Sequence, residues 1–316
     1  MRRAAGRAAA AVLALCLAGC GGAAQAPPTR ALAVPRAAPP GPGGVPAFRH
    51  IFVVVMENLG YRAALRLPRV AALARRGAVA TRYFAVTHPS LPNYLALTSG
   101  HRQVRNDCWF CVVHASNLGA QASAAGVSWG AYMEGLPHAC WLGAFWPFGL
   151  YVGKHDPFRY YASVRDSAAL CAHIQPLRAL TAVLPGGAVP RLSWITPNLC
   201  NDMHSCPAWI GSRWLAAFVP RILASPAWRR GGVLFVTWDE AAGADQRGCC
   251  GRRRGGGHVL TLVFAPGLKP GLRIAEPYNH YSLLATIETA LGLRRLGRAA
   301  GARTLAAFWS TAPRAG

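Results

Sequence analysis

The fold is decided by one stretch, residues 48–58, which reads FRHIFVVVMEN. Its centre, from Ile51 to Val55, is an uninterrupted run of large apolar side chains. Such a run is typical of a strand in a parallel sheet, because helices cover both faces of that sheet. A carboxylate, Glu57, stands at the point where the strand would end. The stretch therefore predicts a buried parallel strand with a charged side chain at its carboxyl end.

The rest of the chain alternates between similar short runs and segments with helical spacing. We expect strands at 79–84, 127–133, 192–196, 233–238 and 260–264, and helices at 68–76, 93–98, 209–223 and 281–291. This alternation predicts an α/β sandwich with a mostly parallel central sheet. In such sheets ligands bind beyond the carboxyl ends of the strands, so functional side chains are sought there.

The composition is that of a folded, strongly basic protein. The 316 residues carry 34 basic and 11 acidic side chains, a formal charge of +23, and 53% of them are hydrophobic. This hydrophobic content excludes an intrinsically disordered chain, and the length excludes a small scaffold held by disulfides alone. The arginines are dispersed, with one tight cluster at 252–254, whereas nucleic-acid binders concentrate charge in a stripe. We expect anionic substrates or anionic lipid as partners, and no nucleic acid.

The N-terminus indicates export. Three arginines stand within the first seven residues, an apolar stretch follows at 8–17, and residues 17–20 read LAGC. This pattern resembles the lipobox of bacterial lipoproteins, so we expect a lipoprotein signal peptide at 1–20 and a membrane surface contact through lipidated Cys20. An ordinary secretory signal is the alternative. Either one predicts an exported protein of the cell envelope or the exterior.

A linker and a single domain are expected after the signal. Residues 21–46 are rich in Pro, Ala and Gly, which predicts an extended tether, and the folded domain is expected over 47–312. The domain contains Cys108, Cys111, Cys140, Cys171, Cys200, Cys206, Cys249 and Cys250. An even number of cysteines in an exported chain indicates disulfides, although the pairing is left open. Half of a zinc site at 108–111 is the weaker interpretation.

Scarce carboxylates stand where predicted strands end. Glu57 follows the strand at 48–56, Asp239 and Glu240 follow the strand at 233–238, and Asp202 lies in the loop after 192–196. Like charges in one cavity repel unless a cation or a proton neutralises them. Each carboxylate taken alone could be a helix cap or a solvated turn. Together they predict a metal site.

A serine is the candidate nucleophile. Ser90 lies in THPSLPNY, residues 87–94, between a predicted strand and a predicted helix. The amide groups at such a helix start can bind an anion, and a nearby cation can activate a serine hydroxyl. The alternative is that Ser90 caps the helix.

Several motifs, taken in order, resemble the bacterial phosphoesterase family, which includes acid phosphatases and non-haemolytic phospholipases C. They are VVMEN at 54–58, THPSLPNYLAL at 87–97, KHDPF at 154–158, ITPNLCNDMH at 195–204, VTWDE at 236–240 and HYSLL at 280–284. The similarity spans about residues 47–295. It implies an alkaline-phosphatase-like three-layer sandwich and a two-step phosphoryl transfer.

The resemblance also implies residue roles. The implied catalytic residues are Ser90, Lys154, His155 and His204. The implied metal ligands are Glu57, Asn58, Asp239, Glu240, Asp202 and His258. Two-zinc members of the wider superfamily carry an Asp-His pair where this chain has Asp239-Glu240. The oxygen-rich set suits Mg²⁺, Ca²⁺ or Mn²⁺, whereas Asp202 with histidines would suit Zn²⁺.

The expected function is metal-assisted hydrolysis of phosphomonoesters through a phosphoserine, of the acid phosphatase type, with phosphoinositides among the implied substrates. Two alternatives stay open at this point. One is a phospholipase C-type phosphodiesterase, which shares the fold and most motifs. The other is a catalytically silent envelope lipoprotein that binds anions.

Overall fold

The computed structural model describes residues 38, 39 and 41–310. These residues lie in one compact unit, Val34–Gly316. The predicted signal peptide at 1–20, Cys20 and most of the tether lie outside the described residues. The described end of the tether differs from the prediction, because Val45 is fully buried in the core. The packed domain therefore begins a few residues before position 47.

An eight-stranded sheet forms the centre of the unit, in the order β10-β2-β9-β8-β1-β7-β3-β6. The central strand β1 (His50–Met56) pairs in parallel with β7 (Leu192–Thr196) on one side and β8 (Gly232–Trp238) on the other. The other strands are β2 (Ala78–Phe84), β3 (Trp129–Met133), β6 (Ile174–Pro176), β9 (His258–Phe264) and β10 (Arg273–Asn279). Only β9 runs antiparallel to its neighbours within this sheet.

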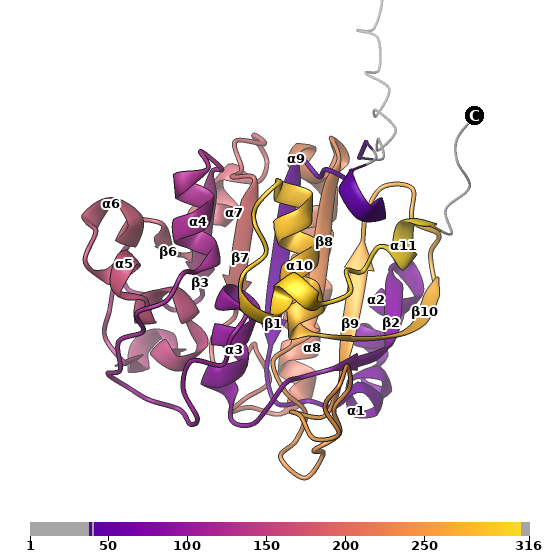
Figure 1. Ribbon diagram of the computed structural model, residues 1–316, viewed down its shortest axis with the longest axis horizontal. Helices are drawn as coiled ribbons and strands as arrows, with labels where there is room; N and C mark the ends of the chain where they lie inside the picture. The colour runs from indigo at the N-terminus through magenta and orange to yellow at the C-terminus, as the bar shows by residue number, and fades with distance from the viewer. Residues whose placement is uncertain (1–37, 40, 311–316) are drawn as a thin grey trace, which may run out of the picture. The chain divides into compact units, whose positions relative to one another are not determined.

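Helices cover both faces of the sheet, so the architecture is a three-layer sandwich (Figure 1). On one face α10 (His280–Leu291) packs on α3 (Ser90–Ser99), and α3 contacts α4 (Leu118–Ala124). On the other face α2 (Pro68–Arg76) packs on α8 (Ala208–Ala224). The expected mostly parallel α/β sandwich is confirmed.

Shorter elements complete the domain. They are α1 (Tyr61–Arg66), α5 (Ala162–Arg165), α6 (Ala168–Cys171), α7 (Leu177–Val183), α9 (Pro226–Arg229), α11 (Ala307–Ser310), and a hairpin of β4 (Phe145–Trp146) and β5 (Tyr151–Val152). Single 3₁₀ turns lie at Pro42–Gly44, Pro147–Gly149, Gly153–His155, Pro157–Tyr160 and Gly297–Gly301. In the part of the chain that the structure describes, no helix has the length and apolarity needed to cross a bilayer.

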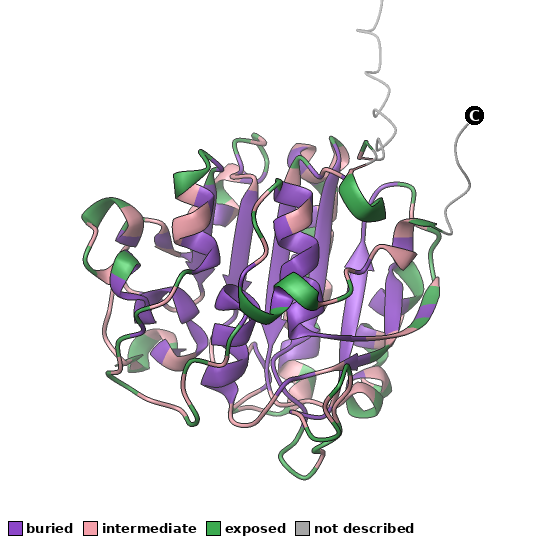
Figure 2. Ribbon diagram, viewed as in Figure 1, coloured by how far each residue is buried: buried purple, intermediate pink, exposed green. Residues whose placement is uncertain are grey.

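The core is built on β1 and β8. Every residue of β1 from Ile51 to Met56 is buried, as is every residue of β8 (Figure 2). Val53 lies opposite Trp194 of β7 and Phe235 of β8, so large side chains on three neighbouring strands share the interior. A strand covered on both faces needs no polar side chain, which is why the continuous apolar run predicted it correctly.

The strands β6 and β10 were not predicted. Both lie at the ends of the sheet order, and β10 includes Arg273, Glu276 and Pro277. Edge strands tolerate charged residues and proline because one side of each edge strand needs no ladder hydrogen bonds. Their pattern therefore lacks the apolar run on which the other strands were recognised.

One buried carboxyl in α10 should make folding stability depend on pH. Burial raises the pKa of Glu288 to about 8, although the Leu296 amide donates to its Oε1 at 2.9 Å. Between its unfolded pKa of about 4.5 and about 8, the unfolded chain has released this proton while the folded chain keeps it. Stability therefore falls as pH rises through this window.

We expect Glu288→Gln to remove that part of the pH dependence. Melting temperatures measured from pH 4.5 to 8.5 should diverge in favour of the variant, by roughly 2–4 °C for each kcal/mol of differential stability. Parallel melting curves for the two proteins across this range would contradict the assignment.

Candidate active site

The scarce carboxylates meet at the carboxyl edge of the sheet. Glu57 directly follows β1, Asp239 and Glu240 follow β8, and Asp202 lies in the loop after β7. The adjacent strands are also linked at their ends, because the Glu57 amide donates to the Asp202 carbonyl and the Asp239 amide donates to the Met56 carbonyl, both at 2.9 Å. We call these four residues the acidic cluster. All of them are buried.

Ser90 lies against the acidic cluster. It is the first residue of α3, is 1% exposed, and its Oγ donates to Glu57 Oε2 at 3.0 Å and to Glu240 Oε1 at 3.4 Å. The segment before it is held by Asn93, whose Oδ1 accepts from the amides of Val86 and Thr87. The N-cap residue is Pro89, so the Ser90 hydroxyl does not cap the helix. It is instead aimed at carboxylate oxygens.

Two histidines extend the cluster. His155 Nδ1 shares a hydrogen bond with Asp202 Oδ2 at 3.1 Å, and its Nε2 lies 3.2 Å from Glu57 Oε1. The ring of His204 lies 5.2 Å from that of His155, centroid to centroid. Glu57, His155 and His204 each offer one ligand atom, and these atoms lie within 4.8 Å of one another. This triad could hold a cation.

Lys154 lies beside the histidines. Its Nζ donates to Asp107 Oδ2 at 2.8 Å and lies 3.3 Å from His204 Nε2. Burial alone would lower the pKa of Lys154, but the hydrogen bond and the charge of Asp107 outweigh it and raise that pKa. Lys154 therefore stays positively charged at the edge of the acidic cluster.

A bound cation would stabilise the acidic cluster. Burial raises the pKa of Glu57, Asp202 and Asp239, and repulsion between the carboxylates raises it further. Asp239 Oδ2 is buried and accepts no hydrogen bond from any described residue. Buried carboxylates with a free oxygen suit a hard divalent cation, because the ion supplies the missing positive charge and uses oxygen ligands. The residues present thus fit a metal site.

The side chains of two expected metal ligands, Asn58 and His258, make no hydrogen bond to the acidic cluster among the described residues. Asn58 joins the cluster through its backbone, since its amide donates to Asp239 Oδ1 at 3.2 Å. His258 has no contact with the acidic cluster among the described residues. Its ring stacks between Tyr61 and Phe84, and its Nε2 hydrogen-bonds to the Thr81 carbonyl at 2.9 Å. His258 begins β9, which runs antiparallel to β8, so it lies at the same edge of the sheet as Asp239 and Glu240. Its ring is nevertheless held by Tyr61, Phe84 and the Thr81 carbonyl instead of the acidic cluster.

Four site residues received no role from the sequence. Tyr94 donates to Glu57 Oε1 at 2.6 Å, and His88 Nδ1 lies 2.8 Å from Glu240 Oε2. Asp107 holds Lys154, and His280 Nε2 hydrogen-bonds to the Asp239 carbonyl at 2.5 Å. Tyr94 follows Ser90 by one helical turn, and Asp107 is one of only 11 acidic residues, so spacing and scarcity could have indicated both.

Every cysteine of the domain is paired. The disulfides are Cys108–Cys111, Cys140–Cys171, Cys200–Cys206 and Cys249–Cys250. The expected structural bridges are confirmed, and the 108–111 pair is a disulfide instead of half a zinc site. Cys200–Cys206 closes the loop that carries Asp202 and His204, so this bridge restricts two site residues.

Solved structures share this architecture. A protein in the alkaline phosphatase superfamily from Vibrio parahaemolyticus gives a TM-score of 0.55 at 12% identity, covering 80% of this chain and 69% of its own. The murine ectonucleotide pyrophosphatase/phosphodiesterase 5 gives 0.51 at 13% identity, with coverages of 78% and 96%. At such identities the likeness shows the fold alone, which is that of the alkaline phosphatase superfamily.

The family follows from the sequence match. The model of the Phosphoesterase family matches residues 49–294, and the chain belongs to that family. Its chemistry is therefore the hydrolysis of phosphoric esters. The chain is 29% identical to the phosphatidylinositol-3-phosphatase of Mycobacterium tuberculosis, over 84% of each protein. It is 28% identical to the phosphate-repressible acid phosphatase of Penicillium chrysogenum, over 80% of this chain and 61% of that protein.

The metal assignment predicts opposite effects of one substitution with and without cation. In chelator, Asp239→Asn should raise the melting temperature, because it removes one of several mutually repelling buried charges. Adding Mg²⁺ or Mn²⁺ should stabilise the wild type, by about 2.7 kcal/mol at a concentration of 100 Kd, and the variant much less.

Thermal melts with and without each cation provide the measurement. Asp166→Asn, which changes a carboxyl in the turn after α5, is the matched control and should respond like the wild type. Equal cation responses of Asp239→Asn and wild type would exclude Asp239 as a ligand.

Proposed function

We propose that this protein is a metal-assisted phosphomonoester hydrolase of the acid phosphatase type that works through a phosphoserine at Ser90. The single observation that carries the proposal is the environment of the Ser90 hydroxyl, which is buried between Glu57 and Glu240. A serine hydroxyl is a weak nucleophile until its proton is taken or its charge is stabilised. The two carboxylates can accept the serine proton, and they can also bind a cation beside the hydroxyl.

The chain's own residues support a two-step displacement. Ser90 Oγ attacks phosphorus while the bond from phosphorus to the ester oxygen breaks, and the Ser90 proton passes to a carboxylate of the acidic cluster. The leaving alcohol takes up a proton from solvent. Lys154 and His155 stabilise charge on the phosphoryl oxygens, which is the largest contribution to this class of reaction. In the second step water attacks phosphorus and the bond from phosphorus to Ser90 Oγ breaks. His204, which lies 3.3 Å from Lys154 Nζ, accepts the proton of that water, and Ser90 Oγ takes its proton back from the carboxylate.

Glu57, Asp239, Glu240 and Asp202 would hold the cation, with His155 and His204 at its side. A bound Mg²⁺, Mn²⁺, Ca²⁺ or Zn²⁺ would lower the pKa of the serine hydroxyl and stabilise negative charge on the phosphoryl group. His258 is left out of this ligand set, because its ring is committed to the stack with Tyr61 and Phe84.

The substrate class proposed is a phosphomonoester carried by a lipid headgroup. The mycobacterial relative of matching length is named a phosphatidylinositol-3-phosphatase, which supports phosphoinositides as substrates. The paired cysteines support export, and the LAGC sequence at 17–20 supports attachment through Cys20. This would place the enzyme at a membrane surface outside the cytoplasm.

Ser90→Ala should abolish turnover without affecting the fold. The substitution removes only the hydroxyl of a buried first-turn residue, so the melting temperature should change little. Hydrolysis of p-nitrophenyl phosphate should fall by at least about a thousandfold, because the covalent route is lost. Ser99→Ala in the same helix is the control and should keep its activity, since its hydroxyl contacts only local groups at the far end of α3. Near-normal turnover by Ser90→Ala would remove Ser90 from the nucleophile role.

A comparison of esters separates the proposal from the phosphodiesterase alternative. The wild type should hydrolyse p-nitrophenyl phosphate much faster than bis-p-nitrophenyl phosphate, and rapid acid quenching should trap phosphate on Ser90. Faster hydrolysis of the diester would overturn the assignment as a phosphomonoesterase. No phosphate release with any of the four cations would instead favour a silent anion-binding protein.

A further inference from the structure

The exposed large apolar side chains gather on two loops. Seven such side chains are exposed among the described residues, and six of them belong to segments 107–112 and 141–150. We call these six residues the apolar rim: Trp109, Phe110, Val112, Phe145, Phe148 and Leu150. Phe110 is 79% exposed and Phe148 is 88% exposed. A soluble protein rarely groups its exposed apolar residues in this way unless they meet a partner or a membrane.

Buried side chains bind the backbones of both loops. Arg159 is 1% exposed, its Nη1 donates to the Trp109 carbonyl at 3.1 Å, and its Nη2 donates to the Leu142 carbonyl. Tyr160 adds a hydrogen bond from its hydroxyl to the Cys108 carbonyl at 2.7 Å. A buried guanidinium that binds one carbonyl from each loop holds both loops in one arrangement. The two loops that carry the apolar rim therefore lie side by side where Arg159 binds them.

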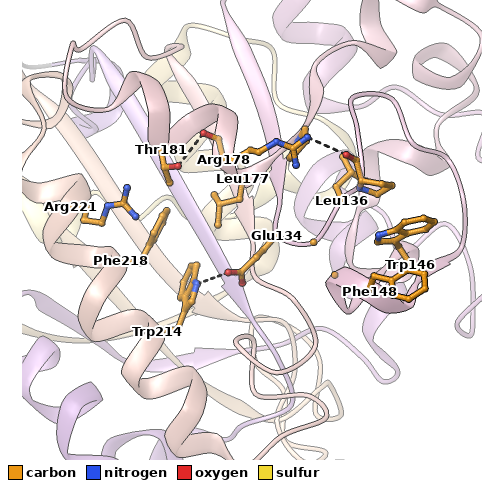
Figure 3. Close-up of a pocket in the computed structure, with 14 residues that line it drawn as sticks. Glu134, Leu136, Trp146, Phe148, Leu177, Arg178, Thr181, Trp214, Phe218 and Arg221 are labelled. Atoms are coloured by element: carbon orange, nitrogen blue, oxygen red, sulfur yellow. Dashed lines mark hydrogen bonds between the residues drawn. The ribbon is translucent and has the colours of Figure 1, made fainter.

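The most exposed residue of the rim packs against other aromatic side chains. The ring of Phe148 lies edge-on to Trp146 at 5.5 Å, and Trp146 lies edge-on to Trp141 at 5.6 Å. Trp146 and Phe148 form one wall of a cavity of about 620 Å³, and Trp214 and Phe218 of α8 lie across from them (Figure 3). Phe148 is thus exposed at the end of a row of three aromatic rings, Trp141, Trp146 and Phe148.

Both loops border the active site. Asp107 begins the first loop, and its Oδ1 accepts from the amide of Leu91, next to Ser90, while its Oδ2 accepts from Lys154. In the second loop the Leu150 carbonyl accepts from the Leu199 amide at 3.1 Å. Leu199 belongs to the loop that carries Asp202 and His204. Whatever binds the apolar rim therefore lies next to the proposed phosphoryl-transfer site.

Exposed arginines stand near both loops of the rim. Arg105 is exposed four residues before Trp109, and the exposed Arg178 and Arg221 line the cavity beside Phe148. The acidic residues nearby are already bonded, since Asp107 binds Lys154 and Glu134 accepts from Trp214, Asn198 and Asn201. Aromatic side chains flanked by arginines match the interface of an anionic bilayer, where the rings enter the headgroup region and the cations meet lipid phosphates.

We propose that the apolar rim docks this protein onto the surface of an anionic lipid bilayer and so presents the active site to phosphoesters in that bilayer. The docking is inferred from the rim and the charges near it, and it does not depend on the proposed function. The delivery of substrate rests on the function proposed above. The rim acts independently of Cys20, because it belongs to the folded domain.

The test uses the full chain with Cys20→Ser in every sample, so that no lipid anchor contributes. Sedimentation with phosphatidylcholine vesicles that contain phosphatidylserine should carry the protein down, and pure phosphatidylcholine vesicles should bind it weakly. The double substitution Phe110→Ser with Phe148→Ser should weaken binding by about tenfold or more. Trp209→Ser is the matched control, because the helical period places Trp209 on the opposite side of α8 from Trp214 and Phe218. It should bind like the wild type.

Two activity measurements separate this proposal from the function itself. The double variant should hydrolyse p-nitrophenyl phosphate within about twofold of the wild type. Its hydrolysis of a phosphatidylinositol phosphate embedded in the same vesicles should fall in parallel with vesicle binding. If no protein hydrolyses either ester, the proposed function fails, while the sedimentation result still decides the docking.

Three outcomes would overturn the docking proposal. The first is equal vesicle binding by the double variant and the wild type. The second is the absence of binding to anionic vesicles. The third is a concentration-dependent dimer in light scattering that the double substitution abolishes, because the rim would then be an interface between copies of the chain.

Discussion

Four carboxylates buried together, two of them hydrogen-bonded to one serine hydroxyl, form the constraint on which the site depends. Burial and mutual repulsion raise the pKa of Glu57, Asp202 and Asp239, so the cluster is costly without protons or a cation. Neighbouring strands β7, β1 and β8 bring these side chains together, because parallel strands end at one edge. This mutual repulsion is an electrostatic cost that a bound divalent cation would reduce, and we propose that the same cation activates Ser90.

The loops beyond that edge have a polar inner side and an apolar outer side. Their inner groups are polar and bonded, as in the pair of Asp107 with Lys154 and the clamp of Arg159 on two carbonyls. Their outer side chains are aromatic and exposed, as in Phe110 and Phe148. Each loop therefore connects phosphoester chemistry on one side with an apolar surface on the other. Such an arrangement suits an enzyme whose substrate has a charged head and an apolar body.

Local pattern predicted the covered strands and the longer helices, because these elements carry their own signal. The strand β1 has its apolar run, and α2 spans Pro68–Arg76, as expected. The edge strands β6 and β10 lack such runs, since edges accept charge and proline. The serine could be placed between a strand and a helix from its motif. Whether its hydroxyl capped the helix or faced carboxylates depended on how α3 lies across the ends of β1 and β8.

By itself, the sequence determined the mostly parallel α/β class, the acidic residues at the strand ends and the family resemblance, because apolar runs and ordered motifs are local properties. Only the tertiary structure decided which residues meet. It joined His155 to Glu57 and Asp202, added Tyr94 and Asp107, and placed His258 in an aromatic stack instead. Strand order and direction set these distances, and they arise from packing between segments far apart in the chain.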